Sequence, residues 1–389
     1  MSLHRVFRVR VAAAHGFAVC RACIAIAAAA VAVTGCGERV AAGAATAEET
    51  GEPAVAMPAS RSIAFDSLFV LERRIQLEEP DSALITEIVG LDVDARGRLL
   101  VPDPTSGQVR VYAPDGRLIR ALGRPGKGPG ELTQPMGAAF DAVGGVYVSE
   151  VGNPRITRFD ASFALDTTFP LREADFGANL EVVGGNVVVF AMRTGPAPEI
   201  YDLYARDGSL AGRFHPLPAA VQQTPYWISA ARSRLAVGAA SIFVANNLLY
   251  PVRRYSLTGE PLGEIGTPPP SWRAPTRPAP GAFAGPTARA EFERWRRTFT
   301  TIAGLGVYQD SLLLVAHEQL DPDVLEYEEA TYRADVYRLG TEPVKLYHDV
   351  PLPGPLLHAG GAVYLLLAGP GESRGWTLGR YRLTLGGAE

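Results

Sequence analysis

The chain has 389 residues, with 37 Lys and Arg against 41 Asp and Glu, 41 Gly, 31 Pro and three Cys. This ordinary globular composition excludes a collagen, a coiled coil and a disordered chain. The first 35 residues contain four of the arginines and no acid, which leaves 33 basic against 41 acidic residues, a formal net charge of −8, in the rest. That balance argues against a nucleic-acid partner, because phosphate binding needs a basic face.

Residues 1–35 are organised like a secretory signal, with a basic start followed by an uninterrupted apolar run over 22–34. Thirteen residues rise only about 20 Å as a helix, short of the ~30 Å hydrocarbon core, so a permanent transmembrane span is not expected. Val33-Thr34-Gly35-Cys36 resembles a bacterial lipobox, which implies that the Cys36 thiol carries a diacylglycerol. An ordinary cleaved signal with a chance cysteine is the alternative.

Residues 36–61 are rich in Ala, Gly, Glu and Pro and have no hydrophobic periodicity, which predicts a flexible tether. The two other cysteines, Cys20 and Cys23, lie in the removed segment, so the mature chain would have no disulfide. The predicted location is the bacterial cell envelope, with the protein lipid-anchored and extracytoplasmic, on the outer-membrane or periplasmic side.

The rest of the chain is repetitive. Residues 93–112 and 140–159 align without a gap at an offset of 47, each as strand, Gly turn, strand, polar loop and a strand that ends in an aromatic residue. This aromatic end recurs at Tyr112, Phe159, Tyr204, Tyr255, Tyr337 and Tyr381. A unit of about 45 residues with four short strands is typical of a propeller blade. We therefore predict an all-β, six-bladed β-propeller over 62–389; seven blades are the main competitor, and a β-sandwich does not explain the repeat.

The two ends of the repeat region predict how the ring closes. The chain ends on the third strand of the sixth unit, over 378–384, while an unassigned strand over 69–77 precedes the first unit. We expect this N-terminal strand to complete the last blade as its outer edge, because closure removes an exposed sheet edge.

One connector carries a family resemblance. Its sequence, Gly-Arg-Pro-Gly-Lys-Gly-Pro-Gly-Glu-Leu over 123–132, followed by Pro135, resembles the NHL-like six-bladed propeller lipoproteins of bacteria. The resemblance implies fold and location more than chemistry. Related propellers include gluconolactonase-type hydrolases and amidating lyases, which are metal-dependent, but their metal-ligand motifs are not recognisable in this sequence.

The predicted turns and loops differ in length between the two faces of the propeller. One face has only short turns, whereas the connections from second to third strand and from blade to blade, on the opposite face, are long. Loops on a rigid scaffold usually carry binding, so we assign function to this loop-rich face. The binding candidates on it are Arg124, Lys127, Glu131, Phe292, Trp295, Phe299, Asp321, Asp323 and Glu326.

The longest insertion, residues 267–300, begins as a Pro-rich segment and changes character from Thr287. Phe292, Trp295 and Phe299 recur there at helical spacing, which predicts a short amphipathic helix. We expect the insertion to pack on the propeller as a lid; contact with a partner or a membrane is the alternative.

The ends of the second strands bring polar side chains to the same face. Asp103, Glu150, Asn246 and His317 are candidate ligands for Ca²⁺ or Zn²⁺. Polar residues at strand ends more often cap turns, so the primary expectation is no cofactor. The favoured function is accordingly a lipid-anchored binding or scaffold protein for a protein, peptide or glycan ligand. The alternative is a metal-dependent, gluconolactonase-like hydrolase or lyase that uses the central mouth of the propeller.

Overall fold

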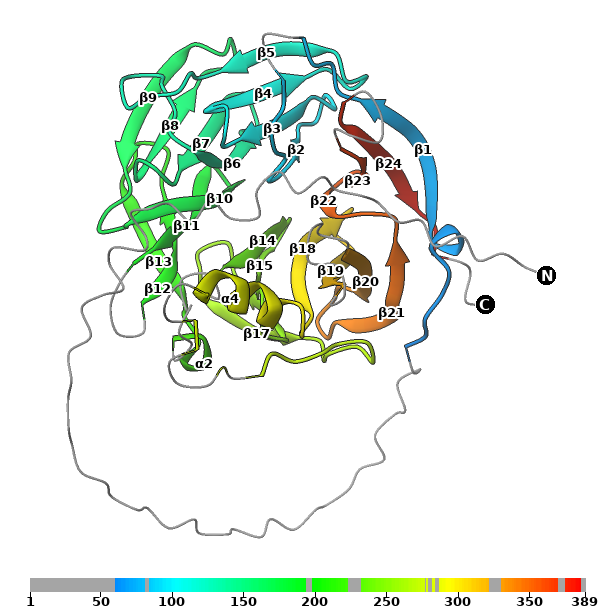
Figure 1. Ribbon diagram of the computed structural model, residues 1–389. Coiled ribbons are helices and arrows are strands. Elements are labelled where there is room, and N and C mark those ends of the chain that lie inside the picture. Colours follow the sequence, from blue (N-terminus) through cyan, green and yellow to red (C-terminus); the bar gives the residue numbers. More distant parts are fainter. Residues whose placement is uncertain are drawn as a thin grey trace, which may run out of the picture. The chain divides into compact units, whose positions relative to one another are not determined.

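The strands form six four-stranded antiparallel sheets around a common axis, which is a six-bladed β-propeller (Figure 1). The predicted fold class is therefore confirmed. The structure is a computed structural model, and it describes residues 60–80, 84–193, 198–222, 232–276, 278, 282–283, 287–321, 330–369 and 375–385.

The first five blades each use four consecutive strands, numbered outward from the axis. Blade 1 consists of β2 (Asp92–Val93), β3 (Leu99–Asp103), β4 (Gln108–Tyr112) and β5 (Leu118–Leu122). Blade 2 consists of β6 (Pro135–Phe140), β7 (Val146–Glu150), β8 (Arg155–Phe159) and β9 (Leu165–Pro170). Blade 3 consists of β10 (Phe176–Val183), β11 (Asn186–Met192), β12 (Glu199–Tyr204) and β13 (Leu210–Pro216). Blade 4 consists of β14 (Ser233–Gly238), β15 (Ser241–Asn246), β16 (Val252–Tyr255) and β17 (Pro261–Ile265). Blade 5 consists of β18 (Thr301–Tyr308), β19 (Leu312–Leu320), β20 (Ala330–Arg338) and β21 (Val344–Leu352).

The sixth blade joins the two ends of the propeller. It consists of β22 (Leu356–Ala359), β23 (Val363–Ala368) and β24 (Thr377–Leu383), with β1 (Phe69–Gln76) as its outer strand. β1 runs antiparallel to β24, from the pair Phe69 and Leu383 to the pair Gln76 and Thr377. The predicted closure by the N-terminal strand is thus observed, and the last blade has no unpaired third-strand edge.

Each interface between neighbouring blades has its own hydrophobic cluster. The buried apolar residues fall into six clusters, each of which combines side chains from two adjacent blades. β1 contributes Phe69 to the interface of blades 5 and 6 and Ile75 to that of blades 6 and 1. The repeated aromatic at the end of each third strand is buried in one of these clusters. Because burial is shared around a ring, stability depends on every interface being present.

Helices are few among the described residues. They are the 3-10 helix η2 (Phe65–Ser67), α2 (Ala219–Gln222) and α4 (Ala288–Arg296), and α4 corresponds to the helix expected after Thr287. In the part of the chain that the structure describes, no helix has the length and apolar character needed to span a bilayer.

The turn between β4 and β5 gives a test of ring closure. Gly116 in this turn has φ +93°, and a Cβ at this position would lie 2.1 Å from the backbone oxygen of Gln76 in the closing strand. We expect Gly116→Ala to lower the free energy of unfolding by about 2 to 4 kcal/mol, because strained φ and steric overlap both act against closure. Chemical denaturation measures the loss.

The matched control is Gly185→Ala, since Gly185 also has a positive φ, +86°, but no heavy atom lies within 4 Å of a Cβ at this position. An equal loss in the two variants would show that contact with the closing strand does not determine the effect at Gly116.

Candidate functional site

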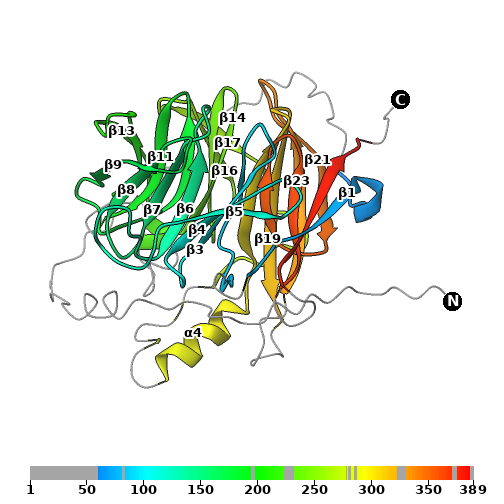
Figure 2. The same cartoon turned by 90° about the horizontal axis from the view of Figure 1, so that it is seen from above.

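The two faces of the propeller are built differently. On one face, the described chain joins first to second and third to fourth strands by turns of two to five residues. On the other face the connections reach 35 residues, between β17 and β18, and Figure 2 shows α4 lying outside the sheets on that side. This loop-rich face is the one to which the sequence assigned function.

α4 is fixed to the propeller by Trp295 and by Phe299, which lies three residues after the helix ends. Phe299 is 1% exposed and belongs to the hydrophobic cluster between blades 3 and 4, and Trp295 packs against the same cluster. The Trp295 indole Nε1 donates to the backbone oxygen of Thr276 at 2.9 Å, which ties the helix to the Pro-rich segment before it. The packing expected for the aromatic residues of the insertion is observed at Trp295 and Phe299, and Phe299 is wrong as a ligand-binding residue because it is buried. Phe292 and Trp295 keep partly exposed rings.

The other binding candidates lie at two places. Arg124 and Lys127 are exposed on the connector between blades 1 and 2, and Arg124 forms an ion pair with Glu131 at 2.9 Å. Asp321 is half-buried at the end of β19, where its backbone oxygen accepts a hydrogen bond from Arg297. Asp323 and Glu326 lie outside the described residues.

The Gly-rich connector that carries the family resemblance is wrapped around one guanidinium. Arg155 at the start of β8 donates to the backbone oxygens of Lys127, Gly128 and Glu131 at 2.6 to 3.3 Å. The same guanidinium pairs with Glu150 at 2.7 Å, and the other oxygen of Glu150 accepts from the Thr133 amide. Glu150 therefore holds the connector through Arg155.

Asp103 has an equivalent role in blade 1. Its carboxylate is fully buried and lies 2.7 Å from Arg110 on β4, which also donates to the backbone oxygen of Leu84 at 2.6 Å. The amide of Thr86 donates to the same carboxylate. Both Leu84 and Thr86 belong to the segment that enters blade 1, so the pair fixes the start of this segment.

Blade 3 repeats the arrangement with the acid on the third strand. Asp202 on β12 forms a close ion pair with Arg193, which donates to the backbone oxygen of Arg172 in the connector that enters the blade. Burial raises the pKa of Asp202, although Arg193 acts in the opposite direction. The pair was not predicted from the sequence, because the residue at the end of the second strand in this blade is Met192.

The four proposed metal ligands do not form one site. Asp103 and Glu150 are each paired with an arginine of their own blade, and Asn246 on β15 accepts a hydrogen bond from the Leu248 amide at 2.9 Å. Among the described His, Cys, Asp and Glu residues, the group of three whose ligand atoms lie within 4.8 Å of one another is His317, Asp335 and Asp349. Only His317 of the sequence-based set belongs to this group.

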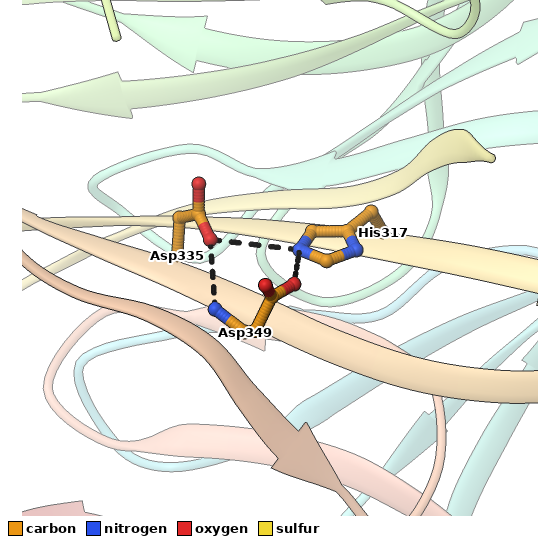
Figure 3. A group of neighbouring side chains, drawn as sticks. All are labelled: His317, Asp335 and Asp349. Atoms are coloured by element: carbon orange, nitrogen blue, oxygen red, sulfur yellow. Dashed lines mark hydrogen bonds and ion pairs between the residues drawn. The ribbon is translucent and has the colours of Figure 1, made fainter. Parts of the chain in front are cut away.

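The three residues come from three consecutive strands of blade 5, β19, β20 and β21. Figure 3 shows one ring nitrogen of His317 facing an oxygen of each carboxylate. The His317 Nε2 atom lies 3.6 Å from Asp335 Oδ1 and 3.7 Å from Asp349 Oδ1. His317 and Asp335 are almost completely buried, at 2% and 0% exposure.

Asp335 is held in its charged form by His317 and by neighbours on the side away from His317. Its Oδ2 atom accepts from Lys345 Nζ at 2.8 Å and from the Tyr250 hydroxyl at 2.9 Å. Burial acts to raise the pKa of Asp335, but the His317 imidazole and the Lys345 ammonium outweigh it and hold that pKa below its ordinary value. Lys345 Nζ also donates to the backbone oxygen of Thr267, where the lid insertion begins.

Asp349 reaches the cluster because β21 is irregular. The pairing of β20 with β21 shifts between Ala334 and Val336, and Asp349 has φ +52°. Its backbone amide donates to Asp335 Oδ1 at 3.0 Å. The Ser271 hydroxyl and amide both donate to the Asp349 carboxylate, so this residue also contacts the lid insertion.

The sequence offered one usable signal for these residues. Asp335 lies two residues before the aromatic end of the third strand, the same place that Arg110 and Asp202 occupy in their blades. A charged residue occupies this place in four of the six repeats, and in blades 1, 3 and 5 it belongs to a buried ion pair. The sequence does not indicate that Asp349 joins this group, because the direction of its side chain depends on a local bulge and not on strand alternation.

A second group of titratable residues lies on the innermost strands. His358 on β22 lies 3.8 Å from Asp92 on β2, and burial lowers the pKa of His358. Burial and the Asp92 charge raise the pKa of Glu181, on β10, well above its ordinary value. These residues lie on the innermost strands of blades 6, 1 and 3, whereas the cluster of His317, Asp335 and Asp349 lies on β19 to β21 of blade 5.

Comparisons with known proteins agree with this architecture. The DUF5128 family model, described as a 6-bladed beta-propeller, matches residues 45–196. The chain is similar in structure to a Bacteroides fragilis protein designated as exported, with a TM-score of 0.55, 12% identity and coverage of 84% of this chain and 98% of that one. It is also similar to a DUF4221 family member from Bacteroides vulgatus, with a TM-score of 0.56, 8% identity and coverage of 83% and 100%. No curated protein matches the sequence. At these identities the likeness concerns the fold.

The buried pair of Asp103 and Arg110 can be tested by substitution. We expect Arg110→Met to lower the free energy of unfolding by about 3 to 5 kcal/mol, because it leaves a fully buried carboxylate without a counter-charge. The double variant Asp103→Leu with Arg110→Met should lose less, since it removes both charges. Urea denaturation of the three proteins measures the difference. A double variant less stable than Arg110→Met would contradict the assignment of charge burial as the cause.

Proposed function

We propose that this protein is a lipid-anchored, extracytoplasmic propeller that binds a protein, peptide or glycan ligand on its loop-rich face. The observation that carries the proposal is the asymmetry of the two faces: one has only short turns, and the other carries the connectors and α4. A scaffold of six sheets fixes the roots of those connectors, so that they can present side chains at defined positions.

The structural roles of the buried acids favour binding over catalysis at this face. Asp103 and Glu150 hold connectors through Arg110 and Arg155, so their charges are already compensated. The exposed residues on this face include three cations, namely Arg124, which pairs with Glu131, Lys127 on the same connector and Arg294 on α4. Exposed cations, together with the partly exposed rings of Phe292 and Trp295 on α4, are suited to a ligand with both anionic and apolar parts.

The proposed cellular location is based on residues 1–36, where an apolar run ends at Cys36 in the sequence Val-Thr-Gly-Cys. A lipid attached at Cys36 would hold the propeller at a membrane through residues 37–61, and acyl chains contribute about 0.8 kcal/mol per buried methylene. The folded part then needs no membrane-binding surface of its own.

Lipidation predicts a clear change in the variant Cys36→Ala. We expect the wild type to incorporate radiolabelled palmitate and to sediment with membranes, whereas Cys36→Ala should incorporate none and remain in the soluble or unprocessed fraction. Cys20→Ala is the matched control, because that cysteine lies before the proposed cleavage site. Label in Cys36→Ala would contradict the anchor.

The binding face can be tested by site-specific photocrosslinking in intact cells. A photoreactive residue at position 127 or 294 should give discrete adducts, because these exposed positions lie on the loop-rich face. The matched controls are positions 96 and 117, exposed arginines in the short turns of the opposite face. Adducts of the same kind and yield from both faces, or from neither, would rule out the proposed binding face.

A further inference from the structure

We propose that His317, Asp335 and Asp349 form a binding site for one divalent transition-metal ion, with Zn²⁺ as the reference ion. The site lies within blade 5, beside the start of the lid insertion, and is separate from the exposed binding face proposed above. Its ligands would be Nε2 of His317 and one oxygen of each aspartate.

The distances fit a shared ion better than a direct hydrogen bond. His317 Nε2 lies 3.6 and 3.7 Å from the nearest carboxylate oxygens, beyond the 2.7 to 3.2 Å of an ordinary N–H···O bond. Two ligands at about 2.0 to 2.2 Å from a tetrahedral ion lie roughly 3.3 to 3.6 Å apart. The observed separations are therefore close to those of ligands around one small ion.

The His317 ring has a buried nitrogen with no hydrogen-bond partner. Nε2 is this atom, although the whole side chain is only 2% exposed. A buried polar atom without a partner is costly, and native proteins seldom retain one without a reason. The atom faces both carboxylates (Figure 3), and a metal ion between them would satisfy it.

Blade 1 supplies an internal reference for the geometry. Asp103 and Arg110 occupy the same two positions of strands two and three as His317 and Asp335, since Val101 pairs with Arg110 and Val315 with Asp335. In blade 1 the charged atoms are in direct contact at 2.7 Å. In blade 5 the corresponding gap is 3.6 Å, although the strands pair in the same register. Because the strand register is the same in the two blades, the longer distance in blade 5 arises from the side chains of His317 and Asp335 and not from the strand pairing.

The charges of the group also differ from those of the other blades. Asp103 and Glu150 each have one arginine as partner, whereas blade 5 places two carboxylates against one ammonium, that of Lys345. The two nearby histidines, His317 and His348 (3.4 Å from Asp349 Oδ2), carry a charge only when protonated, so Lys345 is the one permanent cation in contact with the two carboxylates, and a bound cation would supply a second positive charge. The long distances to His317 favour the cation.

The carboxylates are oriented before any ion binds. Lys345 and Tyr250 hold the distal oxygen of Asp335, which leaves Oδ1 directed at His317. Ser271 donates to both oxygens of Asp349, and the Asp349 backbone occupies the left-handed region to place the side chain there. Such outer hydrogen bonds are typical supports of metal ligands.

The chemistry of the ligands selects the ion. One imidazole nitrogen with two carboxylate oxygens suits Zn²⁺, Mn²⁺ or Co²⁺, whereas Ca²⁺ takes six to eight oxygen ligands. His317 and Asp335 are closed to solvent, and Asp349 is the more open member, at 12% exposure of its side chain. The ion would therefore enter from the Asp349 side, next to Ser271.

The test is metal binding by the full mature chain, purified in detergent and freed of metal with chelator. We expect isothermal titration with Zn²⁺ to show one tight site and the melting temperature to rise with bound Zn²⁺. Cobalt should give the visible absorption of a tetrahedral site. Asp349→Asn and His317→Gln should each weaken Zn²⁺ affinity at least 100-fold.

The matched control is His358→Gln, which removes a histidine that lies 3.8 Å from Asp92 but belongs to no group of three metal-ligating residues in the part of the chain that the structure describes. This variant should still bind one Zn²⁺ with wild-type affinity. Asp349→Asn keeps the shape of the side chain, so it remains informative if His317→Gln fails to fold.

Two results would overturn the proposal. Wild-type protein that binds no Zn²⁺, Mn²⁺ or Co²⁺ would show that the three side chains do not form a metal site. Equal Zn²⁺ affinity in the wild type and Asp349→Asn would show that the ion binds elsewhere. Neither result depends on whether the loop-rich face binds a ligand.

Discussion

The loop-rich face depends on one recurring interaction, a buried carboxylate paired with a cation that also holds the connector entering its blade. It occurs in four blades, in which the cation donates to a connector carbonyl: Arg110 to Leu84, Arg155 to Glu131, Arg193 to Arg172 and Lys345 to Thr267. Connector carbonyls near the core need donors, and a guanidinium can serve a carboxylate and several carbonyls together. The carboxylate in turn offsets the cost of burying the cation. The root of each connector is thereby fixed while its length is free to vary.

The sheets follow a repeated local pattern, whereas the connectors are held by contacts between strands, and this difference explains which features of the fold could be predicted from the sequence. The strands, their order and the closure by β1 follow from local patterns, since β-branched and aromatic runs repeat at nearly constant spacing and each interface buries one cluster. The end of the second strand was also correctly identified as a polar position. Its role was not, because Asp103 and Glu150 depend on partners on the next strand, Arg110 and Arg155. A strand pattern shows which face a residue lies on, but it does not show which neighbour reaches it.

The cluster of His317, Asp335 and Asp349 in blade 5 is a second case in which the strand pattern did not show which side chains are neighbours. His317 was recognised as a possible ligand, and Asp335 could have been found by comparing the third strands of the repeats. Asp349 could not, because a bulge and a left-handed φ turn it toward its neighbours. Strand alternation would assign a direction to every residue of β21, and a bulge changes that assignment by one residue. The partners chosen for His317 on sequence grounds, at the ends of other second strands, were therefore the wrong ones.

The buried ion pair of blade 5 differs from those of the other blades because of the lid insertion that precedes this blade. Its connector is the longest, and two of its residues, Thr267 and Ser271, hydrogen-bond to Lys345 and Asp349. In blades 1 and 2 a single arginine contacts both the acid and the connector, and in blade 3 Arg193 and Arg213 both do so. Lysine has a point charge and only three donors, so it cannot span both as widely, and a second acid, Asp349, binds the connector through Ser271. That second acid adds the negative charge that His317 faces. The long insertion and the histidine cluster are thus parts of one arrangement, in which fixing the root of the lid creates a site with ligands for a cation.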